Sequence, residues 1–150
     1  MDKCELRLDP LSERWTIFSE ARAVVPPAFP SVRDEREHSP PDPFLAGREH
    51  FASHELHRAP DDGDWQVRVV PNRLPALRVE GDATRRSAGF YDRMDGVGAH
   101  EVIIEDPGER ALEDLPLPEI EKVLGAWQVR IIVLLRDHRL RSFFIVKNVG

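Results

Sequence analysis

The sequence has one cysteine, Cys4, among its 150 residues. A single thiol cannot form a disulfide within the chain, and it cannot build a metal site from several cysteines. We therefore interpret Cys4 as an unpaired thiol close to a chain terminus.

Long apolar runs and a surplus of basic side chains are also missing. No stretch of eighteen or more apolar residues occurs, and none follows the first residues of the chain. A membrane-spanning helix or a signal peptide is not expected, so we predict a cytoplasmic protein without a membrane partner. The formal net charge is −6. Because phosphate-tracking proteins usually carry a basic face, we expect no nucleic-acid partner, whereas a small nucleotide stays compatible.

The residues that are present have the balance of a folded domain. Hydrophobic residues make up 41% of the chain and charged residues 32%, which argues against a disordered segment. A chain of this length is about one domain and buries roughly two-thirds of its unfolded surface. We expect a single domain over residues 1–150.

Several segments have strand patterns. Residues 5–8 alternate polar and apolar side chains, residues 9–13 have turn composition, and residues 15–18 are aromatic and β-branched, which predicts a hairpin. A second pair of this kind is expected further on. Short strands are also predicted at residues 65–70, 76–79, 100–105 and 143–148.

A proline-rich excursion and one long helix complete the pattern. Prolines recur between residues 20 and 63, and because proline removes a donor and fixes φ, only short helical turns are expected there. The helix is predicted from apolar side chains at three- and four-residue spacing, namely Leu117, Ile120, Val123, Leu124, Trp127, Ile131, Leu134 and Leu135. This order of elements predicts an α+β fold, an antiparallel sheet with one long helix packed on it. Since strand edges pair readily, a sheet ending at residue 148 is expected to have a partner.

Four motifs occur in an order that resembles one known family. They read LDPLSERWTI with SEARA at residues 8–23, VRVVPNRLPAL at 67–77, GAHEVIIEDP at 98–107, and the helix through Trp127 and Arg130 followed by KNVG at 147–150. Together they resemble the N-terminal half of galactose-1-phosphate uridylyltransferases, which belong to the histidine-triad-like superfamily. The resemblance covers nearly the whole chain and implies an antiparallel histidine-triad-like half.

The resemblance implies a nucleotidyltransferase of galactose metabolism. Such an enzyme moves UMP from UDP-glucose to a hexose 1-phosphate through a covalent uridylyl-histidine. Imidazole is a good nucleophile near neutral pH, and two successive transfers let one pocket serve both sugar phosphates. In the family the nucleophile lies in a His-Pro-His motif shortly after the strand that matches residues 143–148. No His-Pro-His occurs in this sequence. We therefore assign no catalytic residue and expect the chain alone to be inactive.

The resemblance also implies nucleotide-binding positions. Asn72 matches an asparagine that reaches the base and ribose, and its amide both donates and accepts hydrogen bonds. Arg73 and Leu74 flank it, and Leu74 stands where an aromatic residue is common. Arg22 matches an arginine near the phosphates, where a planar fork holds two oxygens. Asn148 matches a residue that contacts the diphosphate. The alternatives are a turn asparagine, a solvent-exposed arginine and a frayed terminal residue.

Family members often carry a structural zinc ion. Its ligand positions correspond here to Asp42, Leu45 and Glu109. Leu45 cannot ligate and Asp42 alone is a poor zinc site, so the resemblance implies that the zinc site is lost and that no cofactor is present.

Other histidines leave two interpretations open. A replacement metal site is one, because on a helix four side chains at three- and four-residue spacing would share a face: Glu49, His50, His54 and His57. Ordinary solvated histidines are the other. His100 is interpreted as a structural strand histidine.

The expected partners are a UDP-sugar and a hexose 1-phosphate, with a homodimer or a complementary C-terminal half. The chain is expected to be a piece of a longer enzyme, the product of a split or decayed gene, or a retained half domain. In the last case it would be a non-catalytic nucleotide-sugar-binding or dimerisation module, and a metal-binding protein is a third class.

Overall fold

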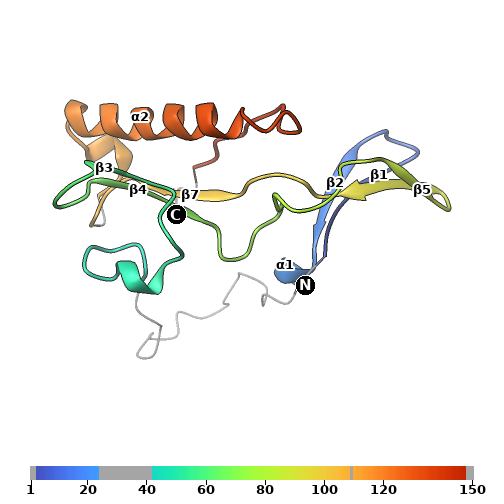
Figure 1. Ribbon diagram of the computed structural model, residues 1–150, viewed down its shortest axis with the longest axis horizontal. Coiled ribbons are helices and arrows are strands. Elements are labelled where there is room, and N and C mark those ends of the chain that lie inside the picture. Colours follow the sequence, from blue (N-terminus) through green and yellow to red (C-terminus); the bar gives the residue numbers. More distant parts are fainter. Residues whose placement is uncertain (1–2, 24–41, 109, 148–150) are drawn as a thin grey trace.

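The computed structural model describes residues 3–23, 42–108 and 110–147. Their strands form two antiparallel sheets at the two ends of an elongated molecule (Figure 1). The predicted α+β class with antiparallel strands and one long helix is confirmed, although the strands are divided between two sheets. The elements are β1 Cys4–Leu8, β2 Trp15–Ser19, α1 Glu20–Ala23, η1 Glu49–Phe51, β3 His57–Ala59, β4 Val67–Pro71, β5 Arg86–Ala88, β6 Tyr91–Asp95, β7 Glu101–Ile104, η2 Leu112–Asp114 and α2 Leu117–Leu134.

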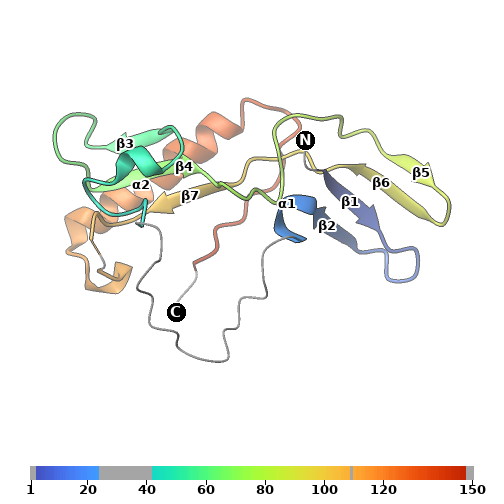
Figure 2. The same cartoon turned by 90° about the horizontal axis from the view of Figure 1, so that it is seen from below.

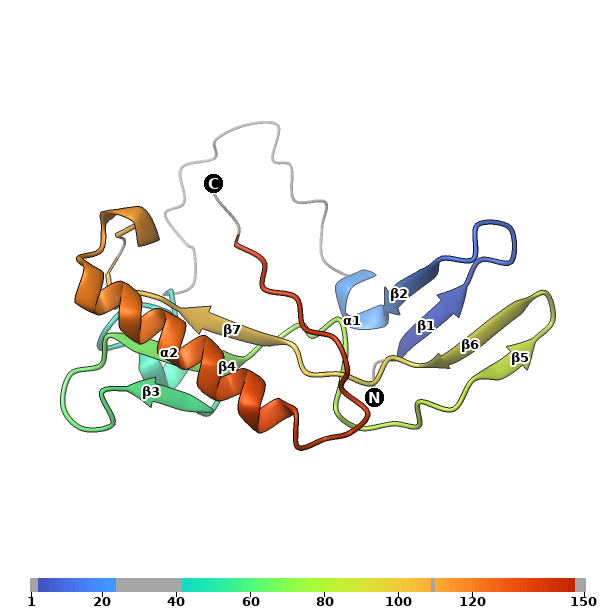
Figure 3. The same ribbon diagram turned by 90° about the horizontal axis from the view of Figure 1, so that it is seen from above.

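The sheet of order β3-β4-β7 carries the main core. Helix α2 lies across it, as Figure 3 shows, and packs against β3 and β4. Val123 and Ala126 are spaced three residues apart, so they share one helix face, and they bury against Val67 and Val69 of β4. Pro118 stands in the first turn of the helix, where a missing backbone donor costs nothing. The apolar stripe of α2 therefore lies on the sheet, as the sequence predicts.

The opposite face of the same sheet is also covered. Trp65, Val70 and Ile104 form a second buried cluster, with Ala52 packed against it. Arg68 points to this side because side chains alternate along a strand, and it is buried as well. Strand β4 is thus enclosed on both faces, which explains its nearly continuous valine sequence.

The second sheet has the order β2-β1-β6-β5 (Figure 2). Strands β1 and β2 pair antiparallel with Leu6 opposite Ile17, and β1 pairs β6 with Leu6 opposite Met94. The predicted hairpin of residues 5–8 and 15–18 is confirmed, and β5 with β6 supplies the second strand pair. Trp15 and Ile17 remain exposed on this sheet.

Two chain segments join the sheets and touch each other. Arg78 and Val97 form an isolated bridge, and the Gly98 N–H donates to the Arg78 carbonyl over 2.7 Å. A Cβ at Gly98 would lie 2.7 Å from Leu77 Cδ1 and 3.0 Å from Leu77 Cβ, so a larger residue here would have to displace the Leu77 side chain. The segments therefore form a narrow junction between the two sheets.

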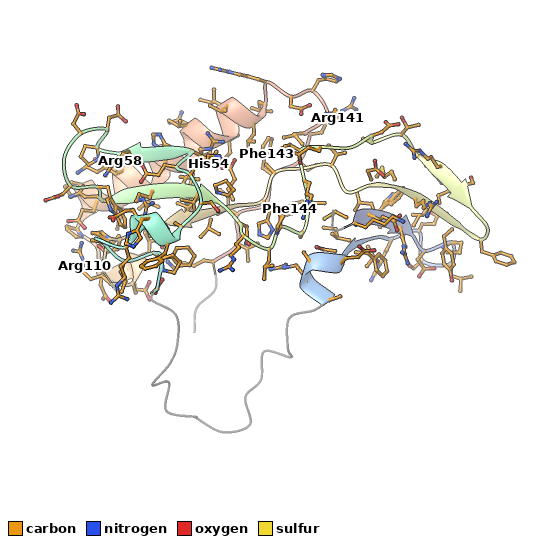
Figure 4. The ribbon with its side chains drawn as sticks, turned by 60° about the horizontal axis from the view of Figure 1, so that its bottom comes forward. His54, Arg58, Arg110, Arg141, Phe143 and Phe144 are labelled. Carbon is orange, nitrogen blue, oxygen red and sulfur yellow. The ribbon has the colours of Figure 1, made fainter. Side chains whose placement is uncertain are left out.

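Two strand predictions are wrong. Residues 76–79 contribute a single bridge and no strand, and residues 143–147 pair with no described strand. The latter segment is apolar, with Phe144 88% exposed, and Figure 4 labels Phe143 and Phe144 on it. A strand needs a hydrogen-bonding neighbour, which a favourable composition alone does not supply.

The excursion of residues 20–63 has the expected short turns where it is described, namely α1 and η1, together with the unpredicted strand β3. Residues 24–41 lie outside the described residues. Within the described ranges, no helix is both long and apolar enough to cross a bilayer.

Candidate functional site

The turn after β4 stands at the junction of the two sheets. Asn72 follows Pro71, and its N–H donates to the carbonyl of His100 over 2.8 Å, which continues the β4–β7 ladder. The Asn72 Oδ1 accepts a hydrogen bond of 2.8 Å from the Leu74 N–H. This Asx-turn is the local reason for an asparagine at the position, because its side chain mimics a backbone acceptor.

His100 holds the far end of the same turn. Its Nδ1 accepts a hydrogen bond of 2.9 Å from the Ala76 N–H, and its Nε2 lies 3.2 Å from Asn72 Nδ2. Burial lowers the pKa of His100, and the positive charge of Arg22 lowers it further. Both effects favour the neutral imidazole, in which Nδ1 can accept.

The sheet of order β2-β1-β6-β5 is connected to this turn by a side chain of β2. Ser19, the last residue of β2, donates its hydroxyl to the Pro75 carbonyl over 3.0 Å. Helix α1 follows directly and carries Arg22, whose charge acts on His100. Strand β2, the 72–76 turn and the start of β7 thus meet in one place.

The predicted nucleotide-binding residues are distributed as follows. Arg73 and Leu74 are exposed within this turn and Asn72 is half-buried in it, whereas Arg22 is exposed on α1. Asn148 lies outside the described residues. His100 was interpreted as a strand histidine, whereas it precedes β7 and contacts the turn. Only the fold could reveal that contact, because no sequence periodicity relates residues so far apart.

Two cavities in the described residues differ in their distance from this group of contacts. A shallow cavity of about 150 Å³ opens next to α1, lined by Ser19, Glu20 and Ala23 together with side chains of β1. A larger open hollow of about 500 Å³ lies around Arg85 and Asp92, away from the 72–76 turn. The convergence of polar groups, and not cavity size, therefore identifies the candidate site.

Two of the positions that match the family's zinc ligands lie in the described residues. The Asp42 Oδ1 accepts a hydrogen bond of 2.9 Å from the Phe44 N–H and caps a local turn, and Leu45 has no donor atom. Glu109 lies outside the described residues. Where the structure describes the chain, no group of three or more His, Cys, Asp or Glu side chains could hold a metal ion.

The alternative cluster fails for a geometric reason. It required one helix, but Glu49 and His50 belong to η1 and His57 belongs to β3. His54, which Figure 4 labels, lies in a loop between them. The Glu49 carboxylate accepts a 2.6 Å hydrogen bond from the Trp65 indole. This bond, followed by hydrogen bonds from backbone N–H groups, lowers the pKa of Glu49 to about 2.

Two ion pairs support the sheet that carries the turn. Arg130 of α2 donates twice to the Glu101 carboxylate, both times over 2.8 Å, and each side chain is only 12% exposed. On the other face, buried Arg68 pairs with Glu55 and stacks over Trp65 at 5.1 Å. The Arg68 Nη1 is buried without a hydrogen-bond partner.

Known proteins show where this chain belongs. No family model matches the sequence. A curated relative, the ADP-glucose phosphorylase of Arabidopsis thaliana, is 36% identical over an alignment 152 residues long, which covers 97% of this chain and 43% of the relative. The crystal structure of an Arabidopsis thaliana ADP-glucose phosphorylase with bound ADP-glucose is similar with a TM-score of 0.54 and 34% identity, over 89% of this chain and 38% of that one.

A GalT-like protein from Arabidopsis thaliana gives a TM-score of 0.54 and 30% identity, over 87% of this chain and 36% of that one. The chain therefore spans about two fifths of the length of these relatives. Over that part, the chain belongs to the family of GalT-like proteins and ADP-glucose phosphorylases, with their histidine-triad-like fold.

Proposed function

We propose that the 72–76 turn, with Arg22 and His100, forms one wall of a nucleotide-sugar site in a nucleotidyltransferase of this family. The observation that carries the proposal is the convergence of these groups at the sheet junction, through the Asn72–His100, Ala76–His100 and Ser19–Pro75 contacts. A positive charge beside a cluster of hydrogen-bonding groups suits a sugar diphosphate.

The nucleotide base is a separate question. The resemblance implies UDP-glucose, whereas the curated relative is an ADP-glucose phosphorylase and a similar structure contains ADP-glucose. Both compounds are nucleoside diphosphate hexoses, so both suit the same phosphate-binding groups. We propose ADP-glucose as the first ligand to test, because it belongs to the relative with the higher identity.

Binding without turnover is the expected behaviour of these 150 residues. A histidine nucleophile within a His-Pro-His motif would accept the nucleotidyl group, and this sequence contains no such motif. The described residues would instead bind and orient the ligand. Robust transfer activity of the purified chain would show that the nucleophile lies elsewhere within it.

Isothermal calorimetry with the 150-residue chain tests the proposal. Titration with ADP-glucose and UDP-glucose is expected to give one site, and Asn72→Ala is expected to weaken it. Arg136→Ala is a control, because Arg136 is exposed beyond the C-terminal end of α2 and belongs to none of the contacts that join the turn to His100 and Ser19. Absence of binding for both nucleotide sugars would refute the proposed function.

The partner and metal expectations stay predictions. Sedimentation of the chain would detect the expected homodimer, and addition of a complementary C-terminal half would detect the alternative assembly. We infer that zinc is not held at the ligand positions of the family, because Leu45 and the locally bonded Asp42 do not fit it. Elemental analysis after purification without chelator is expected to find less than stoichiometric zinc, and one bound zinc per chain would contradict this inference.

A further inference from the structure

Arg139 joins the segment after α2 to a segment that leads into the other sheet (Figure 3). Its Nη1 donates to the Gly81 carbonyl over 3.2 Å, and its Nη2 donates to the Val79 carbonyl over 3.0 Å. The Asp137 carboxylate accepts from the same guanidinium, from Nε over 2.9 Å and from Nη2 over 2.6 Å. The planar fork of donors therefore binds one carboxylate and two backbone carbonyls at the same time.

On one side, Arg139 is attached to the helix-covered sheet. The turn that carries it continues from α2, because the Asp137 N–H donates to the Leu134 carbonyl over 3.1 Å and the Leu140 N–H donates to the Asp137 carbonyl over 2.9 Å. Helix α2 packs on β3 and β4, and the 72–76 turn follows β4 directly. Arg139 is thus fixed to the body that carries this turn.

The two carbonyls that Arg139 binds are attached to the other sheet. The residue after Gly81 donates its N–H to Asp95 Oδ2 over 2.9 Å, at the end of β6. The residue before Val79 donates its N–H to the carbonyl of Gly96, which follows β6, over 2.9 Å. Residues 79–81 are therefore connected to the sheet of order β2-β1-β6-β5 on both sides of their contact with Arg139.

The orientation of one sheet relative to the other decides how the candidate site is assembled. One sheet carries the 72–76 turn, and the other carries Ser19 at the end of β2 and Arg22 on α1. A single hydrogen bond, such as that from Ser19 to Pro75, allows rotation about the contact, whereas contacts at separated points restrict it. We propose that Arg139 is a positioning residue, which holds the sheet of Ser19 and Arg22 in a fixed orientation to the turn. Its role in ligand binding rests on the proposed function, whereas its role in orientation does not.

Two substitutions of Arg139 separate its fork of donors from its charge. Arg139→Gln removes both, and Arg139→Lys retains the charge as a single point that cannot bind the carboxylate and both carbonyls together. The Arg139 side chain is 33% exposed, so neither variant leaves a buried charge without a partner. Arg141→Gln is the matched control, because Arg141, labelled in Figure 4, is exposed on the same segment and makes none of the hydrogen bonds found in the described residues.

Residual dipolar couplings of backbone amides measure the orientation of the sheets without a ligand. In the wild type and in Arg141→Gln, the couplings of β1 and β6 and those of β4 and β7 are expected to fit one alignment tensor. In Arg139→Gln and Arg139→Lys, each sheet should still fit a tensor of its own, and the two tensors should differ. One common tensor in either Arg139 variant, or separate tensors in the wild type, would overturn the inference. Loss of the fit within one sheet would also overturn it, because Arg139 would then support folding and not orientation.

Calorimetry with ADP-glucose tests the consequence for the candidate site. Both Arg139 variants are expected to bind roughly two- to tenfold more weakly, because the ligand must select an orientation that the lost hydrogen bonds no longer hold. Arg141→Gln should bind like the wild type. Unchanged affinity despite a changed orientation would overturn the role of Arg139 in binding. Absence of wild-type binding would refute the proposed function, while the dipolar couplings would still decide the role of Arg139 in orientation.

Discussion

The buried ion pair on the face of β4 opposite α2 predicts an asymmetry between its two partners. The Arg68 side chain is 1% exposed, whereas that of Glu55 is 30% exposed. Glu55→Gln removes the counter-charge and leaves a guanidinium in the interior, whereas Arg68→Met removes the buried charge itself. The two substitutions therefore break the same pair with different consequences.

The magnitudes follow from burial. Removing one partner of a fully buried pair costs about 3–5 kcal/mol, and an exposed pair contributes about 0–1 kcal/mol. Because Glu55 is partly hydrated and Glu49 also lies within the field of Arg68, we expect Glu55→Gln to cost roughly 1–2 kcal/mol. Arg68→Met also removes an Nη1 that has no partner, and replacing a buried charge by an apolar side chain is often neutral. We expect it to cost less than about 1 kcal/mol.

Urea denaturation followed by tryptophan fluorescence measures both variants. The midpoints should shift without a change in slope if both variants unfold in two states. Glu121→Gln is the matched control, because it removes the same charge at an exposed position of α2 and should change the free energy of unfolding by less than about 0.5 kcal/mol. If Arg68→Met were the more destabilising variant, the guanidinium would contribute net stability and the reasoning would be wrong.

Three further predictions concern the core and the turn. The folded state lowers the pKa of His100 below 6.5, so the stability that this neutral side chain contributes is complete above that pH and is lost as the pH falls through the folded pKa. In chemical denaturation, His100→Asn should therefore lose less stability on acidification than the wild type. Glu101→Gln should cost about 2 kcal/mol in urea unfolding, and Arg130→Met added to it should recover part of the loss. Val123→Ala should cost about 2 kcal/mol by the same measurement, whereas Leu124→Ala, at a side chain 49% exposed, should cost less than half as much.

The sequence correctly predicted the elements whose apolar residues repeat at a regular spacing. The opening hairpin and α2 follow from alternation and from three- and four-residue spacing, and both are present. Strand β3 was missed because its three residues follow a proline-rich stretch, and it exists only by pairing with β4. The strand predicted at residues 143–148 is the converse case, since its composition is favourable but its described residues find no partner.

At the candidate site, too, local features could be predicted from the sequence and contacts between distant segments could not. Asn72 was found through a motif, and its Asx-turn with Leu74 is a local feature that sequence chemistry explains. The hydrogen bonds from the Ala76 N–H to His100 and from the Ser19 hydroxyl to Pro75 join segments that are far apart in the sequence. No pattern within one segment predicts such a contact. The sequence therefore predicted the turn as a candidate site, but it did not predict which residues stabilise the turn.

The site depends on the weaker part of the fold. The helix-covered sheet is stabilised by a buried apolar core, whereas the junction is held by individual hydrogen bonds, such as Ser19 to Pro75 and Ala76 to His100. Single hydrogen bonds contribute only about 0.5–1.5 kcal/mol each, so the turn can open without unfolding of the α2 sheet. A ligand that binds only the closed turn would add its binding free energy to this local equilibrium. Nucleotide sugar should therefore slow amide exchange at Leu74 and Ala76 more than at Val123, and equal protection throughout would mean that the junction and the core open together.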